Sequence, residues 1–353
     1  MADAADSKSA ARECVRVRVP PPAPRTDECF SDRTMNLTSL SQVKDWCIRS
    51  GFHPNRVLGQ NFLIDRNVLD AILDAALGGL RVAGCGLSGN HQLPTTNYQL
   101  PTVLEIGPGL GVLTEGLLSR GCAVTAIEKD PVLADRLAAA LGHPENLTVL
   151  KGDALDYIKQ GQCDGFPAMV SNLPYQAGTR ILIELVERVG TDAATGKMPV
   201  VPVYDGLTPK PSTTNYQLPT SPETIVVLLQ TEVAERLAAK EGSKTRGLSG
   251  VRVQFDYDVQ IVRKVSASCF WPRPEIGSTV VKLVRHHRND AVGAEVRALF
   301  RRLTKQAFEH RRKQLGSIFK GLIESTARAE ELSNEDWLAL SRSLVAAGEG
   351  DTV

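Results

Sequence analysis

The stretch from Val103 to Gly111 constrains the fold of this chain more than any other. It reads Val-Leu-Glu-Ile-Gly-Pro-Gly-Leu-Gly, so apolar residues are followed by three glycines at alternate positions. The apolar residues predict a short buried strand, and the glycines predict a tight turn where the backbone must approach a ligand closely. Leu113, Leu117 and Leu118 then share one face of a predicted helix. A strand, a glycine turn and a helix in this order open a nucleotide-binding α/β sheet.

The spacing of the glycines separates two kinds of ligand. A dinucleotide fingerprint has the form Gly-x-Gly-x-x-Gly, whereas residue 112 of this chain is Val. The pattern Glu-x-Gly-x-Gly-x-Gly, from Glu105 to Gly111, resembles the loop of S-adenosylmethionine-dependent methyltransferases, whose ligand carries no pyrophosphate. An ordinary glycine-rich turn between a strand and a helix remains the alternative for this motif alone.

The charge of the chain is unevenly distributed. The 353 residues are 42% hydrophobic and 23% charged, as in globular proteins with room for two domains, and the formal net charge is only +1. Residues 285–320 nevertheless contain ten Lys or Arg and three acids. A local positive field of this kind favours binding to a phosphate backbone. A solvated helix face is the alternative explanation, and charge alone leaves both open.

The cysteines and the apolar runs indicate the cellular compartment in which the protein is expected. The seven cysteines are scattered and form no Cys-x-x-Cys pair, which predicts neither a zinc site nor a disulfide framework and fits a reducing cytoplasm. The first residues, Met-Ala-Asp-Ala-Ala-Asp, lack the apolar segment of a secretory signal. The apolar run from Ile225 to Leu229 is far too short to cross a bilayer. We therefore expect a cytoplasmic protein that binds no metal and no membrane.

The chain divides into three predicted parts. Residues 1–36 are polar and rich in proline and are predicted to be a disordered extension. Residues 37–286 carry the alternating strand and helix pattern of the α/β sheet. Residues 287–353 are predicted to form a small helical domain that binds RNA.

Two low-complexity insertions, at about 84–101 and 190–222, interrupt the α/β part. The octapeptide Thr-Thr-Asn-Tyr-Gln-Leu-Pro-Thr occurs at residues 95–102 and again at 213–220. Two copies do not make a repeat architecture, so a pair of loop insertions is the simpler explanation and a partner-binding tag is the alternative. Each insertion precedes a predicted strand, so we expect both to lie away from the edge of the sheet where the ligand binds.

Hydrophobic periodicity and capping residues predict the secondary structure of the remaining chain. Helices are expected after Ser39 and Asp65 as N-caps, at 232–240 and 291–308, from about Arg311, and at 335–346. Strands are expected at 103–106, 123–127, 147–150, 168–171, 224–229, 251–265 and 279–284, the last at the edge of the sheet.

Acidic residues follow two successive predicted strands. Glu128 ends the strand at 123–127, and Asp153 follows the strand at 147–150. The carboxyl ends of parallel strands share one edge of a sheet, which is the ligand-binding edge. There Glu128 can accept hydrogen bonds from both ribose hydroxyls of a cofactor, and Asp153 can reach its adenine amine.

The tetrapeptide Asn-Leu-Pro-Tyr from Asn172 to Tyr175 follows the next strand, at the same edge. Methylation of an adenine amine is difficult because the nitrogen lone pair is delocalised into the ring. The side-chain oxygen of Asn172 and a main-chain carbonyl held by Pro174 can accept the amine hydrogens and localise that lone pair. Tyr175 offers a π-face to a base swung out of its stack, and Phe270 is the candidate for the opposite wall. A simple strand-ending turn is the alternative.

The most specific motifs occur together and in a fixed order. They are Leu58-Gly-Gln-Asn-Phe-Leu63, Glu105-x-Gly-x-Gly-x-Gly111, Ile127-Glu128, Gly152-Asp-Ala154, Asn172-Leu-Pro-Tyr175, Glu232-Val-Ala-x-Arg-Leu237, Phe270-x-Pro-x-Pro274 and Ala307-Phe-x-x-Arg-Arg-Lys313. In these motifs the chain resembles the ribosomal RNA small-subunit adenine dimethyltransferase A family, over about residues 50–320. It departs from the family at Glu275-Ile-Gly-Ser278, where Lys-Val-Asp-Ser is usual.

The resemblance implies a fold and a reaction. The fold is a Rossmann-like S-adenosylmethionine-dependent methyltransferase sheet with a small all-α C-terminal domain. The reaction is dimethylation of the exocyclic amines of two adjacent adenosines near the 3′ end of small-subunit rRNA, within a pre-ribosomal small subunit. We expect a monomer. The alternatives are a ribosome-assembly factor whose rRNA binding matters more than methylation, and a resistance-type rRNA adenine methyltransferase.

Roles for individual residues follow from the resemblance and from the charge pattern. The resemblance implies cofactor contacts by Asn61, Leu63, Gly107, Glu128, Asp153 and Asn172, to which the glycine loop adds Gly109. It also implies that Asn172, Leu173 and Tyr175 hold the target adenine, and Pro174 is assigned to the same catalytic group because it holds the neighbouring main-chain carbonyl. The basic clusters assign RNA binding to Arg246, Arg297, Arg301, Arg311, Arg312 and Lys313.

Overall fold

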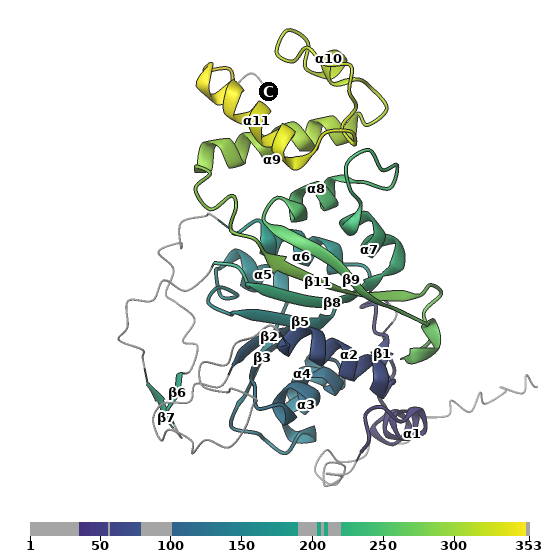
Figure 1. Cartoon of the computed structure of the whole chain (residues 1–353). Coiled ribbons are helices and arrows are strands. Elements are labelled where there is room, and N and C mark those ends of the chain that lie inside the picture. Colours follow the sequence, from purple (N-terminus) through teal and green to yellow (C-terminus); the bar gives the residue numbers. More distant parts are fainter. Residues whose placement is uncertain are drawn as a thin grey trace, which may run out of the picture.

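A seven-stranded sheet forms the centre of the molecule (Figure 1). The computed structural model describes residues 35–55, 57–78, 101–189, 203–205, 208–210 and 220–350. The strand order is β4-β3-β2-β5-β8-β11-β9; the first five strands are parallel, and β11 runs antiparallel to both β8 and β9. The bounds are β2 Thr102–Ile106, β3 Ala123–Glu128, β4 Leu147–Lys151, β5 Ala168–Asn172, β8 Thr224–Gln230, β9 Tyr257–Val265 and β11 Ser278–Arg285.

Helices cover both faces of this sheet, as expected for a sheet built from parallel strands (Figure 1). One apolar core lies between the sheet and α1, α2, α3 and α4, and a second lies between the sheet and α5, α6 and α7. The Rossmann-like fold predicted from the sequence is therefore confirmed. The bounds are α1 Leu40–Ser50, α2 Arg66–Leu77, α3 Val112–Ser119, α4 Pro131–Ala140, α5 Ala154–Lys159, α6 Gly178–Val186 and α7 Thr231–Ala238.

The C-terminal helices form a third core beyond the α5–α7 layer (Figure 1). Helix α8 joins the two parts, because Val251 packs in this third core and Val253 packs in the second core. The division into domains at residues 286 and 287 stays a prediction. The bounds are α8 Leu248–Gln254, α9 Ala294–Glu309, α10 Leu315–Ile318 and α11 Asn334–Ala346.

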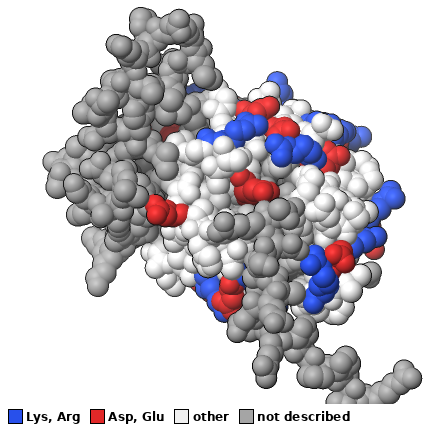
Figure 2. Space-filling model, turned by 90° about the horizontal axis from the view of Figure 1, so that it is seen from below, with Lys and Arg blue, Asp and Glu red and all other residues white. Residues whose placement is uncertain are grey.

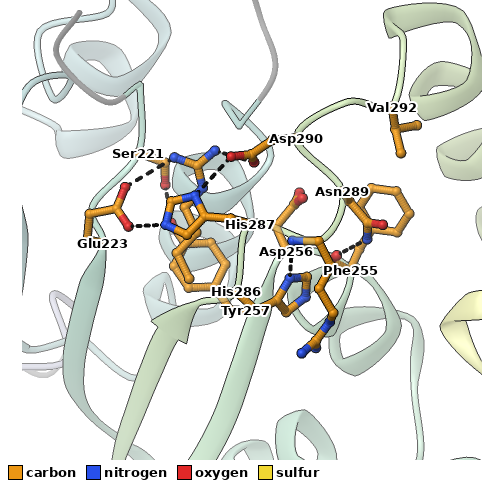
Figure 3. Close-up of polar contacts among 12 residues, drawn as sticks. Ser221, Glu223, Phe255, Asp256, Tyr257, His286, His287, Asn289, Asp290 and Val292 are labelled. Carbon is orange, nitrogen blue, oxygen red and sulfur yellow. Dashed lines mark hydrogen bonds and ion pairs between the residues drawn. The ribbon is translucent and has the colours of Figure 1, made fainter. Parts of the chain in front are cut away.

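The segment between β11 and α9 is fixed by ion pairs (Figure 3). The His287 ring lies 2.8 Å from a Glu223 carboxylate oxygen and 2.9 Å from one of Asp290. Asp290 raises the pKa of His287, since its carboxylate favours the charged imidazolium. Arg297 of α9 also pairs with Asp256, which immediately precedes β9, at 2.9 Å. The start of α9 is thus tied directly to the sheet.

Two of the strand predictions are wrong. The strand expected at 251–265 begins only at Tyr257, because residues 248–254 form α8. A Cβ on Gly250 would lie 2.5 Å from the Arg236 main-chain oxygen, so α8 packs closely against α7. This long-range packing prevails over the β-branched Val251 and Val253, which favour a strand locally. The edge strand is β9 and not the strand at 279–284, because β11 pairs on both sides.

The helix predictions hold with changes at the ends. Asp65 caps α2, where its carboxylate accepts a hydrogen bond from the Val68 amide. Ser39 precedes α1 but makes no capping bond with its side chain. Helix α9 begins at Ala294 instead of 291, and the helix expected near Arg311 begins at Leu315.

The two insertions lie largely outside the described residues. Within the segment at 190–222, two short antiparallel strands are described, β6 Val203–Asp205 and β7 Thr208–Lys210, where only a loop was expected. The segments precede β2 and β8 in the sequence, and the site lies at the carboxyl end of β2. A pair of two-residue strands, β1 Phe62–Leu63 and β10 Phe270–Trp271, was also missed.

Charges of both signs share the face opposite the C-terminal helices. Figure 2 shows Lys and Arg interspersed with Asp and Glu over the part of this face that is described. Surface pairs of this kind contribute little to stability individually. Across the described residues, no helix is long and apolar enough to span a membrane.

Candidate active site

The glycine loop turns the chain sharply between β2 and α3. Gly107, Gly109 and Gly111 have φ values of 70°, 59° and 92°, in the left-handed region that side chains disfavour. A Cβ on Gly111 would lie 2.6 Å from a Leu137 methyl group, and one on Gly109 would lie 3.0 Å from the Phe62 ring. The turn therefore requires glycine, and it places the start of α3 beside a cleft.

Glu128 forms one wall of that cleft at the end of β3. Its side chain is 6% exposed. One carboxylate oxygen accepts a hydrogen bond from the Gly109 amide at 3.0 Å, and the other accepts one from the Asp130 amide at 2.8 Å. Burial raises its pKa, although these main-chain donors act in the opposite direction. The carboxylate is thus held in one orientation and is directly coupled to the glycine loop.

Asp153 lies at the end of the neighbouring strand. It is the N-cap of α5, where it accepts a hydrogen bond from the Leu155 amide at 2.9 Å. Lys129 donates a second hydrogen bond to its carboxylate at 2.8 Å and is the main cause of its lowered pKa. Asp153 is therefore an ionised acceptor beside the cleft at neutral pH.

Asn172 ends β5, on the other side of the glycine loop. Its side-chain amide nitrogen donates a hydrogen bond to the main-chain oxygen of Asn61 at 2.9 Å. This bond orients the amide, because it commits the NH₂ group to the protein. The carbonyl oxygen is the group that remains to accept a hydrogen bond from a ligand.

The turn that follows Asn172 presents Leu173, Pro174 and Tyr175 to the cleft. The Pro174 carbonyl accepts hydrogen bonds from the Ala177 and Gly178 amides at 3.1 and 2.7 Å, which fixes the turn at the start of α6. The Tyr175 phenol bonds to the Ser278 hydroxyl at 2.6 Å. Burial raises its pKa, so the ring carries no charge at neutral pH.

The loop at residues 57–61 closes the cleft from the N-terminal side. The Gln60 side chain donates to an Asp130 carboxylate oxygen at 2.8 Å, so the loop is tied to the segment after β3. The Asn61 side chain donates to the main-chain oxygen of Gly59 at 3.0 Å. The Asp130–Gln60 contact was missed from the sequence, although Asp130-Pro131 is a typical helix start that places Asp130 at this edge.

One cleft brings these elements together, with an empty volume of about 1040 Å³ that includes open solvent. Among the described residues that line it, the charged ones are Glu128, Lys129 and Asp153. The single lysine is paired with Asp153, so the cleft lacks the cluster of basic side chains that a pyrophosphate favours. The predicted residues found in the lining are Asn61, Leu63, Gly107, Gly109, Glu128, Asp153, Asn172, Leu173, Pro174 and Tyr175.

The prediction for Phe270 is wrong. Its side chain is 2% exposed and belongs to the core between the sheet and α1–α4, and it does not line the cleft. The cause is the pairing of β10 with β1, which sets Phe270 opposite Leu63. The Phe270 ring therefore lies in the core, opposite the cleft residue Leu63, and offers no face to a base.

The structure also corrects part of the predicted RNA surface. Arg246 and Arg297 are 1% and 3% exposed, so neither can contact a phosphate at the surface. Arg297 pairs with Asp256, and Arg246 donates to Asn334 at 2.9 Å. On α9, Arg297 and Thr304 lie at one edge of the buried face that also contains Leu299, Phe300 and Leu303, so this face is wider than the apolar stripe. The apolar stripe alone did not reveal that the buried face extends to Arg297.

The remaining four basic residues differ in exposure. Arg301 and Arg311 are partly buried, and each donates a hydrogen bond to a main-chain oxygen, of Glu187 and Lys244 respectively. Arg312 and Lys313 are exposed. The contact of Arg311 also brings the loop after α7 next to the loop after α9, so Lys244, Arg312 and Lys313 lie in adjoining exposed segments.

The described residues hold no group of three or more His, Cys, Asp or Glu side chains that could bind a metal ion. Cys47, Cys122, Cys163 and Cys269 are free. Burial raises the pKa of the Cys122 thiol to about 11, so this group is not nucleophilic at neutral pH.

Known proteins are similar to this chain in both sequence and fold. Ribosomal RNA small subunit methyltransferase A of Bifidobacterium longum (strain DJO10A) is 30% identical over 346 residues, which cover 90% of this chain and 97% of that protein. A dimethyladenosine transferase from Plasmodium falciparum superposes with a TM-score of 0.58 at 20% identity, over 81% of this chain and 98% of that one. The 23S rRNA methyltransferase ErmE superposes with a TM-score of 0.52 at 22% identity, over 81% and 100%.

The two superpositions establish the fold, and the sequence matches establish the family. Residues 51–339 match the family described as ribosomal RNA adenine dimethylase. This span includes the glycine loop, both strand-end acids and the Asn172–Tyr175 turn. The chain therefore belongs to the ribosomal RNA adenine dimethylase family.

Proposed function

We propose that this protein transfers two methyl groups from S-adenosylmethionine to the exocyclic amine of each of two adjacent adenosines near the 3′ end of small-subunit rRNA. It acts as a monomer on a pre-ribosomal small subunit in the cytoplasm. The observation that best supports the chemistry is the position of Asn172, whose oriented amide lies in the same cleft as Glu128 and Asp153.

The residues of the cleft fit S-adenosylmethionine. Glu128 is positioned for the ribose hydroxyls, and Asp153 is positioned for the adenine amine. The glycine loop keeps side chains away from the ligand, and Leu63 supplies an apolar contact. The acidic balance of the lining suits a ligand that carries a sulfonium cation and no phosphate. When bound, the cofactor supplies an electrophilic methyl group.

The protein contributes orientation and electrostatics to the reaction. The Asn172 oxygen and a main-chain carbonyl of the following turn accept the two hydrogens of the target amine. Preorganised acceptors of this kind localise the lone pair towards the methyl group. Tyr175 stacks on the flipped adenine, and Leu173 and Pro174 complete its pocket. The scheme requires no titrating base, because the ammonium product loses its proton readily.

The RNA is held by the exposed cations near the C-terminal helices. Arg312 and Lys313 are suited to phosphate contacts, and Lys244 extends the same surface from the loop after α7. Such contacts position the RNA without reading its sequence. The partly buried Arg311 joins the two loops of this surface through its bond to Lys244, whereas Arg301 bonds to Glu187 at the end of α6.

Methyl transfer to immature small ribosomal subunits tests the proposal. Radiolabelled methyl groups should enter small-subunit rRNA, and primer-extension stops should fall at two adjacent adenosines near its 3′ end. Stops in large-subunit rRNA would instead indicate a resistance-type enzyme. Rescue of subunit maturation by a methylation-dead variant that still binds would indicate an assembly factor.

A further inference from the structure

The Tyr175 ring is held at both ends. The main chain of its turn is fixed through the Pro174 carbonyl, and its phenol is bonded to the Ser278 hydroxyl at 2.6 Å. The two residues are 103 positions apart in the sequence. Because the phenol oxygen lies on the long axis of the ring, this bond fixes the direction of that axis and hence the position of the ring beside the cleft.

Ser278 is itself held in the sheet by neighbours on both sides. It is fully buried, at the first position of β11, and pairs with Gln230 of β8 and Val265 of β9. The preceding carbonyl, of Gly277, accepts a hydrogen bond from the Thr231 amide at 3.1 Å. The anchor of the Tyr175 ring is therefore the hydrogen-bonded core of the sheet.

Ser278 does not line the cleft, whereas Tyr175 does. The hydroxyl therefore cannot contact a substrate base directly. It can affect the reaction only through the position of the Tyr175 ring on which the base stacks. Because the Tyr175 ring is already fixed, less side-chain entropy is lost when the base binds.

We propose that Ser278 is a positioning residue for methyl transfer, which holds the Tyr175 ring at the position where it receives the flipped adenine. This inference rests on the proposed function, because it assumes that Tyr175 stacks on the target base. It adds a residue from β11 to a site that otherwise comes from the loops at the ends of β1, β2, β3, β4 and β5.

The same sheet offers a matched control. Ser221 and Tyr257 form another buried hydroxyl–phenol bond, also 2.6 Å long, and both residues are labelled in Figure 3. Ser221 precedes β8 and Tyr257 begins β9, at the end of the sheet away from the cleft. Ser221→Ala removes an equivalent bond, so it reports the cost to stability without a change at the Tyr175 ring.

The test compares Ser278→Ala, Tyr175→Phe, the double variant and Ser221→Ala in methyl transfer to immature small subunits. Loss of one buried hydrogen bond of about 1 kcal/mol corresponds to roughly a fivefold loss in kcat. We expect such a loss in both single variants and no further loss in the double variant, since both changes remove one bond. The dissociation constant for S-adenosylmethionine should stay within twofold, and Ser221→Ala should keep the full kcat.

Three results would overturn the inference. These are a wild-type kcat in Ser278→Ala, losses that multiply in the double variant, and an equal loss in Ser221→Ala. If Ser278→Ala does not fold, Tyr175→Phe decides alone, because it keeps the ring and the serine and must still lose kcat. Absence of methyl transfer by the unaltered protein would contradict the proposed function instead.

Discussion

The Asn172 side-chain amide donates a hydrogen bond to the main-chain oxygen of Asn61, 111 residues earlier, at 2.9 Å. The bond joins the end of β5 to the loop that closes the cleft. It also determines which end of the amide faces a ligand, because the NH₂ group is already engaged. The orientation of the residue at the centre of the proposed mechanism thus depends on a loop from the other end of the domain.

Replacement of Asn172 by Ala should abolish most methyl transfer. The variant loses the acceptor that localises the lone pair of the target amine, and such preorganised groups contribute about 10²- to 10³-fold to kcat. A rate assay with saturating S-adenosylmethionine and immature subunits measures the effect. Asn172→Asp keeps an acceptor but loses the bond to Asn61, so it should show an intermediate rate.

Asn146→Ala is the matched control for this prediction. The Asn146 amide also donates to a main-chain oxygen, that of Cys122, at 2.7 Å, and the residue does not line the cleft. Its replacement should leave the rate within twofold. An unchanged rate in Asn172→Ala would contradict the role assigned to this residue.

The two aromatic residues expected to sandwich the base should respond differently to the same change. Phe270→Leu alters a core side chain, so it should cost on the order of 1 kcal/mol of stability and keep the catalytic rate. Tyr175→Leu removes a stacking face, which is worth about 1–3 kcal/mol per base, so kcat/KM should fall roughly 5- to 150-fold. Thermal unfolding and steady-state kinetics on both variants distinguish the roles. Equal losses of kcat/KM in the two variants would show that Phe270 does form a wall of the site.

The basic residues should separate into a surface set and a structural set. The double variant Arg312→Ala, Lys313→Ala should lower the slope of log affinity for rRNA against log salt by about 2, with little change in stability. Arg297→Met leaves Asp256 buried without its partner, so it should destabilise the fold by about 3–5 kcal/mol. Filter binding at several salt concentrations and urea unfolding measure the two effects. An unchanged salt slope in the double variant would exclude these side chains from phosphate contact.

Most of the sequence-based predictions came from short local patterns of residues. The glycine loop, the acids Glu128 and Asp153 and the Asn172–Tyr175 turn all follow short apolar strands, and parallel strands bring such ends together. These parts of the cleft could therefore be predicted from local patterns, whereas Asn61 and Leu63 were assigned through the family resemblance alone. The hydrogen bonds that orient Asn172 and Tyr175 could not, because their partners are Asn61 and Ser278, more than 100 residues away.

The wrong predictions share one physical cause. Phe270, Arg297 and residues 251–254 were each assigned from their immediate neighbours, and each is determined by a distant packing partner. Phe270 is buried by the pairing of β10 with β1, and Arg297 is buried against Asp256. Residues 251–254 are helical because α8 packs between α7 and α9. Tertiary contacts prevailed over local preference in all three cases.

A buried acid beneath the glycine loop has no assigned role in the reaction. Glu105 is fully buried in β2, and one of its oxygens accepts a hydrogen bond from the Thr114 hydroxyl at 2.7 Å. Its other oxygen has no hydrogen-bond partner among the described residues. Burial raises its pKa from 4.5 to about 8, and the nearby Glu128 adds to the shift.

Glu105 should therefore make the protein less stable as the pH rises from about 4.5 to about 8. In this window the unfolded chain has lost the Glu105 proton and the folded protein keeps it, so the folded state binds more protons. Stability then falls with pH, by at most about 1.4 kcal/mol per pH unit for one group. Glu105→Gln, which has the same shape and does not titrate, should flatten this part of the curve. Urea unfolding between pH 5 and pH 8 measures the difference in unfolding free energy between Glu105→Gln and the unaltered protein. The contributions of all other titrating groups cancel in this difference. The exposed Glu145→Gln is the control and should keep the original slope; parallel curves for the unaltered protein and Glu105→Gln would show that Glu105 is ionised in the fold.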